Sequence, residues 1–175
     1  MSTLRVNTIT NTSGNADINN VGKIINVVQA IKSDTASYSV GQGLFSSDVV
    51  NVSYAAASSS NKLLVIAQFN MATTTHAALY ATLHVAGSPS YRGNADGNRN
   101  RVTASARPGN DGGQENFSIV HLISSPSTSS TTYDVRGSHA QDASLTMYLN
   151  RTEDDVNQNY EGRCASSITI LEFVG

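Results

Sequence analysis

Apolar and polar residues alternate with a period of two along most of the chain, which is the spacing of β-strands and not of helices. The strongest run covers residues 61–69. Its odd-numbered positions from 63 onward are apolar, and so are two even-numbered positions between them: Leu63, Val65, Ala67, Phe69, Leu64 and Ile66. A strand that is apolar on both faces suits the middle of a sandwich.

Shorter runs with the same period predict further strands at residues 49–54, 77–85, 117–123, 133–135, 145–149 and 166–174. Residues 23–32 (KIINVVQAIK) are ambiguous, because their apolar positions also fit a helical stripe. Their Ile and Val content favours a strand. Roughly eight to ten short strands, separated by Ser, Asn and Gly, predict an all-β fold: an antiparallel β-sandwich or jelly-roll-like domain.

Three long turn-rich segments interrupt the predicted strands, at residues 87–113, 124–132 and 151–163. The first contains two strong turn dipeptides, Asp96-Gly97 and Asp111-Gly112. Loops of this length in a compact β domain commonly carry function. Binding surface is therefore expected in these segments.

Charge is scarce in this sequence. Charged residues make up 14% of the chain, against about 25% in an ordinary globular protein, and the formal net charge is −2. These values exclude a broadly basic surface for nucleic acid. The hydrophobic content of 39% excludes a chain that is disordered by composition. The expected surface is polar, mostly uncharged, suited to hydrogen bonding with sugars and little affected by salt.

The few charges cluster in two of the predicted loops. Four arginines lie in the first loop beside one aromatic residue, and the acidic run Glu153-Asp154-Asp155 lies in the third. The arginine cluster is too small for nucleic acid, but it could contact a sugar or a phosphate at a loop tip. The candidate receptor-binding residues are Tyr91, Arg92, Asp96, Arg99 and Arg101.

The sequence carries no recognisable catalytic or metal-binding motif. It has no G-x-S-x-G, S-x-x-K or H-E-x-x-H, and its four histidines have no metal-ligand spacing. His84 and His121 lie on predicted strands, where a structural histidine is the commoner case. Residues 94–98 lack the pattern of a calcium loop and predict a plain turn. Cys164 is expected to be a small, partly buried residue near a strand start. No catalytic residue, cofactor or metal is predicted.

Residues 1–20 stand apart from the domain predicted over residues 21–175. They have too few apolar side chains to form a core, so they are either disordered or pair with copies of themselves or with a neighbouring protein. The candidate attachment residues are Leu4, Val6 and Ile9. The segment lacks the apolar core of a secretory signal, and no stretch approaches the ~18 apolar residues of a membrane span. Synthesis in a cytoplasm without membrane insertion is expected.

Segments at both ends of the chain resemble a known class of proteins. The opening MSTLRVNTITNTSG resembles the starts of virion structural proteins and tail fibres of bacteriophages, particularly marine and cyanobacterial ones. The next segment, GKIINVVQAIKSDT, resembles the first strand of the domain that often follows, and ASSITILEFVG resembles its usual end. NKLLVIAQF and SSPSTSSTTYDVR resemble strands from the middle of that domain.

The resemblance implies a non-enzymatic β-sandwich that forms a homotrimer in the virion, after assembly in the host cytoplasm. It implies a short tail fibre or fibre knob that contributes to host attachment. Other virion or tail proteins would bind through residues 1–20, and a host-surface glycan or protein would bind at the loops. Two alternatives stay open: a head fibre or capsid decoration protein, and a small jelly-roll enzyme that degrades polysaccharide.

Overall fold

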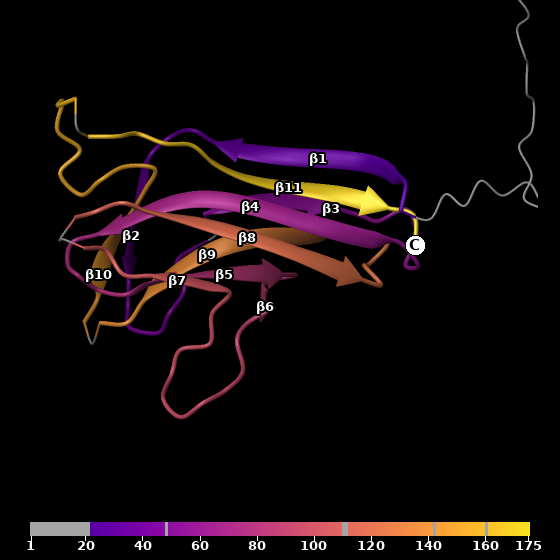
Figure 1. Cartoon of the computed structure of the whole chain (residues 1–175), viewed down its shortest axis with the longest axis horizontal. Helices are drawn as coiled ribbons and strands as arrows, with labels where there is room; N and C mark the ends of the chain where they lie inside the picture. Colours follow the sequence, from indigo (N-terminus) through magenta and orange to yellow (C-terminus); the bar gives the residue numbers. More distant parts are fainter. Residues whose placement is uncertain (1–21, 48, 110–111, 142, 160) are drawn as a thin grey trace, which may run out of the picture.

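The computed structural model describes residues 22–175 except residues 48, 110, 111, 142 and 160. These residues form two antiparallel sheets and contain no helix. Among them there is therefore no helix long and apolar enough to cross a membrane. The predicted all-β sandwich is therefore confirmed (Figure 1). The strands are β1 (Ile24–Lys32), β2 (Ala36–Val40), β3 (Val50–Tyr54), β4 (Lys62–Thr73), β5 (Leu79–Val85), β6 (Ser88–Ser90), β7 (Ala104–Ala106), β8 (Glu115–Ser124), β9 (Thr131–His139), β10 (Leu145–Leu149) and β11 (Ser166–Phe173).

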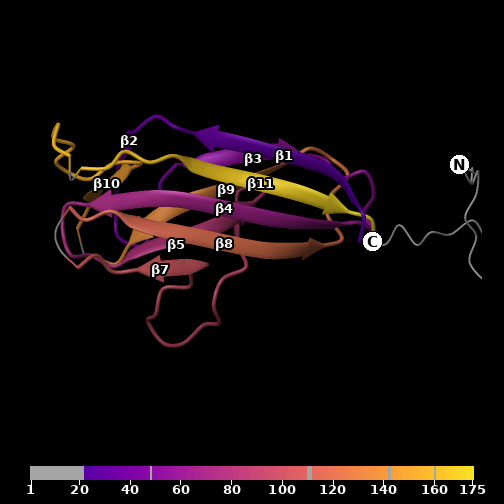
Figure 2. The same ribbon diagram turned by 45° about the horizontal axis from the view of Figure 1, so that its top comes forward.

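The larger sheet is built around β4. It has the strand order β1-β11-β4-β10-β2, and β8 pairs with the other side of β4. Along one edge, β4 pairs first with β11 and then with β10, while β8 follows its other edge over ten residue pairs. Figure 2 shows β1, β11, β4 and β8 lying side by side. β4 is therefore the central strand of this sheet, which agrees with its being the strongest apolar run of the sequence.

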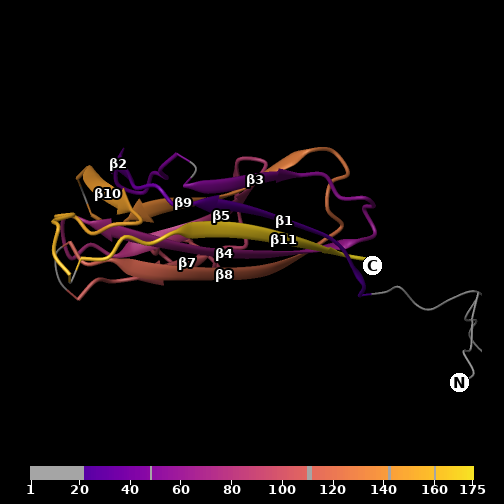
Figure 3. The same cartoon turned by 90° about the horizontal axis from the view of Figure 1, so that it is seen from above.

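The smaller sheet has the order β3-β9-β5-β6, and β7 also pairs with β5. β6 and β7 take successive parts of the same edge of β5, because β6 pairs with residues 83–85 and β7 with residues 79–81. The chain therefore leaves this edge after Ser90 and returns to it at Ala104. Figure 3 shows that β1 begins and β11 ends at one end of the sandwich, while the loop before β11 lies at the other.

The core lies between the two sheets. Alternate residues of β4 point into it and are fully buried, opposite alternate residues of β5 and β9: Leu63, Val65, Ala67, Phe69, Leu79, Ala81, Leu83 and Val135. Phe69 stacks on Phe117 of β8, with ring centroids 5.1 Å apart. Each such large side chain contributes about 1.5–3 kcal/mol through burial. The inward face predicted for residues 63–69 is confirmed.

The ambiguous residues 23–32 form a strand, as predicted, because β1 pairs with β11 along its length. The interpretation of residues 87–113 as one continuous loop is wrong, because they include β6 and β7. These strands read Ser-Pro-Ser and Ala-Ser-Ala, which carry no alternating pattern, and they exist through their pairing with β5. β2 was likewise not predicted. Residues 1–20, including Leu4, Val6 and Ile9, lie outside the described residues.

A buried carboxylate links the two sheets near the end of β11. Glu172 is almost completely buried and accepts hydrogen bonds from the Tyr54 hydroxyl, the backbone N–H of Ala57 (2.8 Å) and the Asn61 amide (2.6 Å). Burial alone would raise the pKa of Glu172, but these hydrogen bonds outweigh it and hold the pKa below the usual glutamate value. The carboxylate therefore stays ionised and fastens the β3–β4 connection to β11.

We expect Glu172→Gln to lower the free energy of unfolding by about 1–3 kcal/mol, because its amide NH₂ would face hydrogen-bond donors. The folded-state pKa is lowered, so the wild-type carboxylate stabilises the fold above the unfolded-state pKa. That stability is lost as pH falls below about 4 and through the folded-state pKa. Urea unfolding as a function of pH measures both effects.

The exposed carboxylate of Asp154 supplies the control, and Asp154→Asn should change the free energy by less than about 0.5 kcal/mol. Equal stabilities of wild type and Glu172→Gln at neutral pH would contradict this account of the buried carboxylate.

Candidate functional site

The segment between β6 and β7 forms a loop that projects from the body of the sandwich (Figure 1). It contains all five candidate receptor-binding residues. Residues 93–101 are exposed throughout, and Arg92 is half-buried. Because both ends of the loop return to the edge of β5, a rigid strand positions it. We call residues 91–103 the arginine loop.

Backbone and hydroxyl hydrogen bonds close the base of the arginine loop. The Thr103 hydroxyl accepts from the Leu83 N–H (3.1 Å) and donates to the Ser90 carbonyl (3.3 Å). Farther out, the Gly93 N–H donates to the Val102 carbonyl at 3.1 Å, and Arg101 Nε donates to the Gly93 carbonyl at 2.8 Å. Arg101 thus braces the loop through the Nε edge of its guanidinium while the residue remains exposed.

Tyr91 anchors the loop to the opposite sheet. Its ring stacks on His121 of β8, with centroids 4.8 Å apart and planes 24° apart. The residue has a φ of 52°, which is unusual for a side chain other than Gly, and it remains 40% exposed. Partial burial raises the pKa of the Tyr91 phenol. Tyr91 therefore turns one ring face to the protein and keeps a part of its surface open to solvent.

The tip of the arginine loop is a tight turn. The Arg99 N–H donates to the Asp96 carbonyl at 3.2 Å, and the side chains of Asp96 and Arg99 form an exposed ion pair. Gly97 has a φ of 54°, which suits glycine at this turn. The Asp96 carboxylate is paired with Arg99 and the backbone forms a turn. This geometry agrees with the plain turn predicted at residues 94–98. The tip brings together Asp96 and Arg99, while Tyr91 and Arg101 lie at the base.

A polar cavity of about 450 Å³ lies on the outer side of the smaller sheet, and no pattern in the sequence indicates it. Asp134 and Arg136 line it and form an ion pair, with Nε to Oδ1 at 2.6 Å, in which the Asp134 side chain is almost fully buried. His84 lies beside Asp134 in the neighbouring strand. Burial lowers the pKa of His84, although the Gly87 carbonyl opposes this by accepting from its Nδ1 at 3.3 Å. The cavity offers hydrogen-bonding groups whose charges are already paired.

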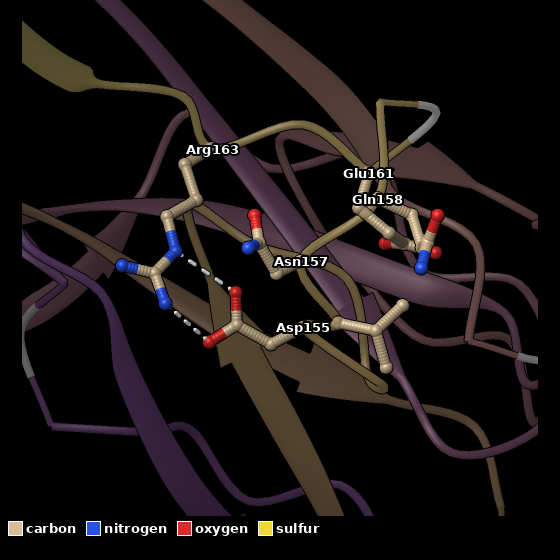
Figure 4. Close-up of a pocket in the computed structure, with 6 residues that line it drawn as sticks. Asp155, Asn157, Gln158, Glu161 and Arg163 are labelled. Atoms are coloured by element: carbon tan, nitrogen blue, oxygen red, sulfur yellow. Dashed lines mark hydrogen bonds and ion pairs between the residues drawn. The ribbon is translucent and has the colours of Figure 1, made fainter.

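The loop before β11 lines a second polar cavity, of about 430 Å³ (Figure 4). Arg163 donates to both carboxylate oxygens of Asp155, at 2.9 and 2.7 Å. This pairing lowers the pKa of Asp155 and raises that of Arg163. Arg163 therefore neutralises the Asp155 carboxylate of the acidic run at residues 153–155.

Asn150 fixes the start of this second loop, a role that the sequence reasoning missed. Its Nδ2 donates to the carbonyls of Lys32 and Asp34, both at 2.9 Å, and its Oδ1 accepts from the Ser166 hydroxyl at 2.6 Å. The residue is fully buried and has a φ of 59°. An Asn directly after a predicted strand is the available signal, because Asn tolerates positive φ better than most residues.

The described histidines lie apart and have separate structural contacts. His84 and His121 lie on strands, as predicted, and the fully buried His139 donates from Nε2 to the Val40 carbonyl at 2.7 Å. Within the described ranges, no three His, Cys, Asp or Glu side chains lie close enough together to hold a metal ion. Cys164 is partly buried two residues before β11, as predicted, and contacts the Gln114 side chain.

We expect Thr103→Val to loosen the base of the arginine loop, because the variant keeps the shape of Thr but leaves the Leu83 N–H without its acceptor. The free energy needed to open the base of the loop should fall by about 1–3 kcal/mol. Amide hydrogen exchange at Leu83 and Gly93 measures the opening. Thr103→Ser keeps the hydroxyl and should exchange more slowly than Thr103→Val; equal rates in the two variants would contradict the role given to the hydroxyl.

No protein-family model matches the sequence, and no curated protein is significantly similar to it. Among solved structures, the chain is similar to a chain in the structure of infectious bursal disease virus, Gx strain, with 14% sequence identity and a TM-score of 0.36. The match covers 85% of this chain and 36% of the viral chain, so this chain spans little more than a third of that chain's length. Similarity at this level identifies neither a family nor a function.

Proposed function

We propose that this protein is a non-enzymatic structural protein of a bacteriophage virion, a short tail fibre or the distal knob of one. It works as a homotrimer and contributes to host attachment. Residues 1–20 attach it to other virion proteins, and the arginine loop contacts a glycan or protein of the host surface. The observation that carries the proposal is the arginine loop itself, which projects from a rigid sandwich and concentrates cations on a protein that has few.

The chemistry of the loop suits a polar ligand. Arg99 and Arg101 present planar groups with several donors, which match the oxygens of phosphates, carboxylates and acidic sugars. The exposed part of Tyr91 offers a flat apolar surface at the base of the same loop. The loop is braced at its base by the contacts of Tyr91, Arg101 and Thr103, so little conformational freedom is lost on binding.

The interactions of the two buried carboxylates, Asp134 and Glu172, also support binding over catalysis. Asp134 and Glu172 are each held by a cation or by several hydrogen-bond donors, which leaves them poorly placed to transfer protons. The largely uncharged surface suits a protein that functions outside the cell, because interactions made by uncharged groups depend little on ionic strength.

We expect the double variant Arg99→Ala and Arg101→Ala to bind host cells at least about tenfold more weakly than wild type, because arginines at the centre of an interface often dominate binding. Adsorption of the labelled protein to host and non-host cells measures this. Arg163→Ala removes an exposed arginine from the other loop and should bind like wild type. Host binding that is unchanged in the double variant would rule out the arginine loop as the contact.

The same experiment separates the other functions. Equal adsorption to host and non-host cells by the wild-type protein would favour a head fibre or capsid decoration protein. Release of reducing sugar from host polysaccharide would favour an enzyme.

Deleting residues 1–20 should leave a folded trimer that no longer joins virions, because the described residues already form a core between the two sheets. Circular dichroism and light scattering measure folding and mass, and incorporation into particles is measured by complementation of a phage that lacks the protein. Loss of folding in the truncated chain would contradict this division of the chain.

A further inference from the structure

The larger sheet has an apolar face that points away from the core. On this side, the register of β1, β11, β4 and β8 places residues in four rows across the sheet. We call these positions the outer face. The rows are Ile24–Phe173–Lys62–Ser124, Val27–Leu171–Leu64–Leu122, Gln29–Thr169–Ile66–Val120 and Ile31–Ser167–Gln68–Ser118. One complete row is apolar, and each of the others contributes at least one large apolar side chain.

The apolar side chains of the outer face remain open to solvent. Val27, Val120 and Leu122 are 55%, 56% and 51% exposed, and Ile31 is 65% exposed. Exposure at single positions is normal for a soluble protein. Here Val27 and Leu122 lie in one row and are joined across it by Leu171 and the half-buried Leu64, while Val120 lies beside Leu122 in the next row. Ile31 stands apart from this continuous surface, in a row that is otherwise polar.

The outer face also carries a shallow apolar hollow of about 220 Å³. The residues that line it are Gly22, Lys62, Leu64, Leu122, Phe173 and Val174. A hollow of this kind takes a side chain from a partner, and such anchored side chains supply much of the free energy of protein–protein contacts.

The charges of the outer face favour a second copy as the occupant. Lys62 is the one charged residue in the four rows, and it lies at their end. Two such faces can therefore meet with no like charges opposed at their centre, whereas a charged partner would find no counter-charges there. Gln29 and Thr169 hydrogen-bond to each other at 2.8 Å, so these polar groups need no partner from outside.

The size of the face agrees with this occupant. Four strands about 4.8 Å apart, each with about eight residues of ~3.3 Å, span roughly 500 Å² before the relief of the side chains is added. A specific interface buries on the order of 800 Å² from each partner, and the largest apolar patch of a typical monomer is about 300–600 Å². The outer face therefore lies in the upper part of the range for the largest patch of a monomer, and the side chains that stand out from it bring its accessible area closer to what a subunit contact requires.

We infer that the outer face is the surface through which copies of this chain pack against one another, with an apolar side chain of one copy in the hollow of the next. The association rests on the outer face alone. Only the number of copies, three about a common axis, rests on the proposed function.

The test compares the mass of the full-length wild type with that of Leu122→Glu and Val120→Glu, by size-exclusion chromatography with light scattering over a wide range of concentration. A carboxylate buried in an apolar contact should weaken association by at least about a hundredfold. Leu44→Glu is the matched control, because Leu44 is 63% exposed but lies outside the outer face. Urea unfolding measures whether each variant is folded. If a glutamate variant does not fold, the uncharged variant Leu122→Ser takes its place in the comparison.

A wild-type oligomer that persists in Leu44→Glu and dissociates in the outer-face variants supports the inference. A wild type that is monomeric at all concentrations overturns it, and so does an oligomer that the outer-face variants leave intact. If the wild type is monomeric and begins to associate when Leu4, Val6 and Ile9 are replaced by Ser, the chain covers its own face and the inference is wrong. No cells are involved, so this test can fail while host attachment stands, and host attachment can fail while this test succeeds.

Discussion

The pairing of β4 with three other strands is the constraint on which this structure depends. One face of β4 fills the core with Leu63, Val65 and Phe69, all fully buried. The other face carries Leu64 and Ile66 into the outer face, between β11 and β8. Because side chains alternate strictly along a strand, a shift of the register by one residue would exchange these two faces. The sandwich and the apolar surface beside it therefore arise from the same register.

The buried polar side chains Glu172 and Asn150 are both satisfied by several hydrogen bonds. Glu172 and Asn150 each make several hydrogen bonds to segments that are distant in sequence, and each fixes one end of the sandwich. The cost of burying such groups is met only when every partner is in place. They therefore specify the connections between strands, while the apolar core supplies most of the stability.

The arginine loop shows how a flexible composition can be given a defined shape. Its sequence is rich in Gly, Asn and Arg, and by itself it predicts only turns. The edge of β5 holds both of its ends, and His121 on the opposite sheet supports Tyr91. The loop thus combines exposure at its tip with order at its base, which is the usual arrangement of binding loops on β-sandwiches.

The sequence by itself determined the strands that alternate and the face that each turns to the core, because a period of two is a local property. It also placed the charged clusters in loops. Only the tertiary structure decided that Ser88–Ser90 and Ala104–Ala106 are strands, since these segments gain their shape by pairing with β5. It also decided that Tyr91 meets His121, that Asp134 pairs with Arg136 beside a cavity, and that the second apolar face of β4 joins a continuous outer surface. Such contacts depend on strand order and register, which no local pattern encodes.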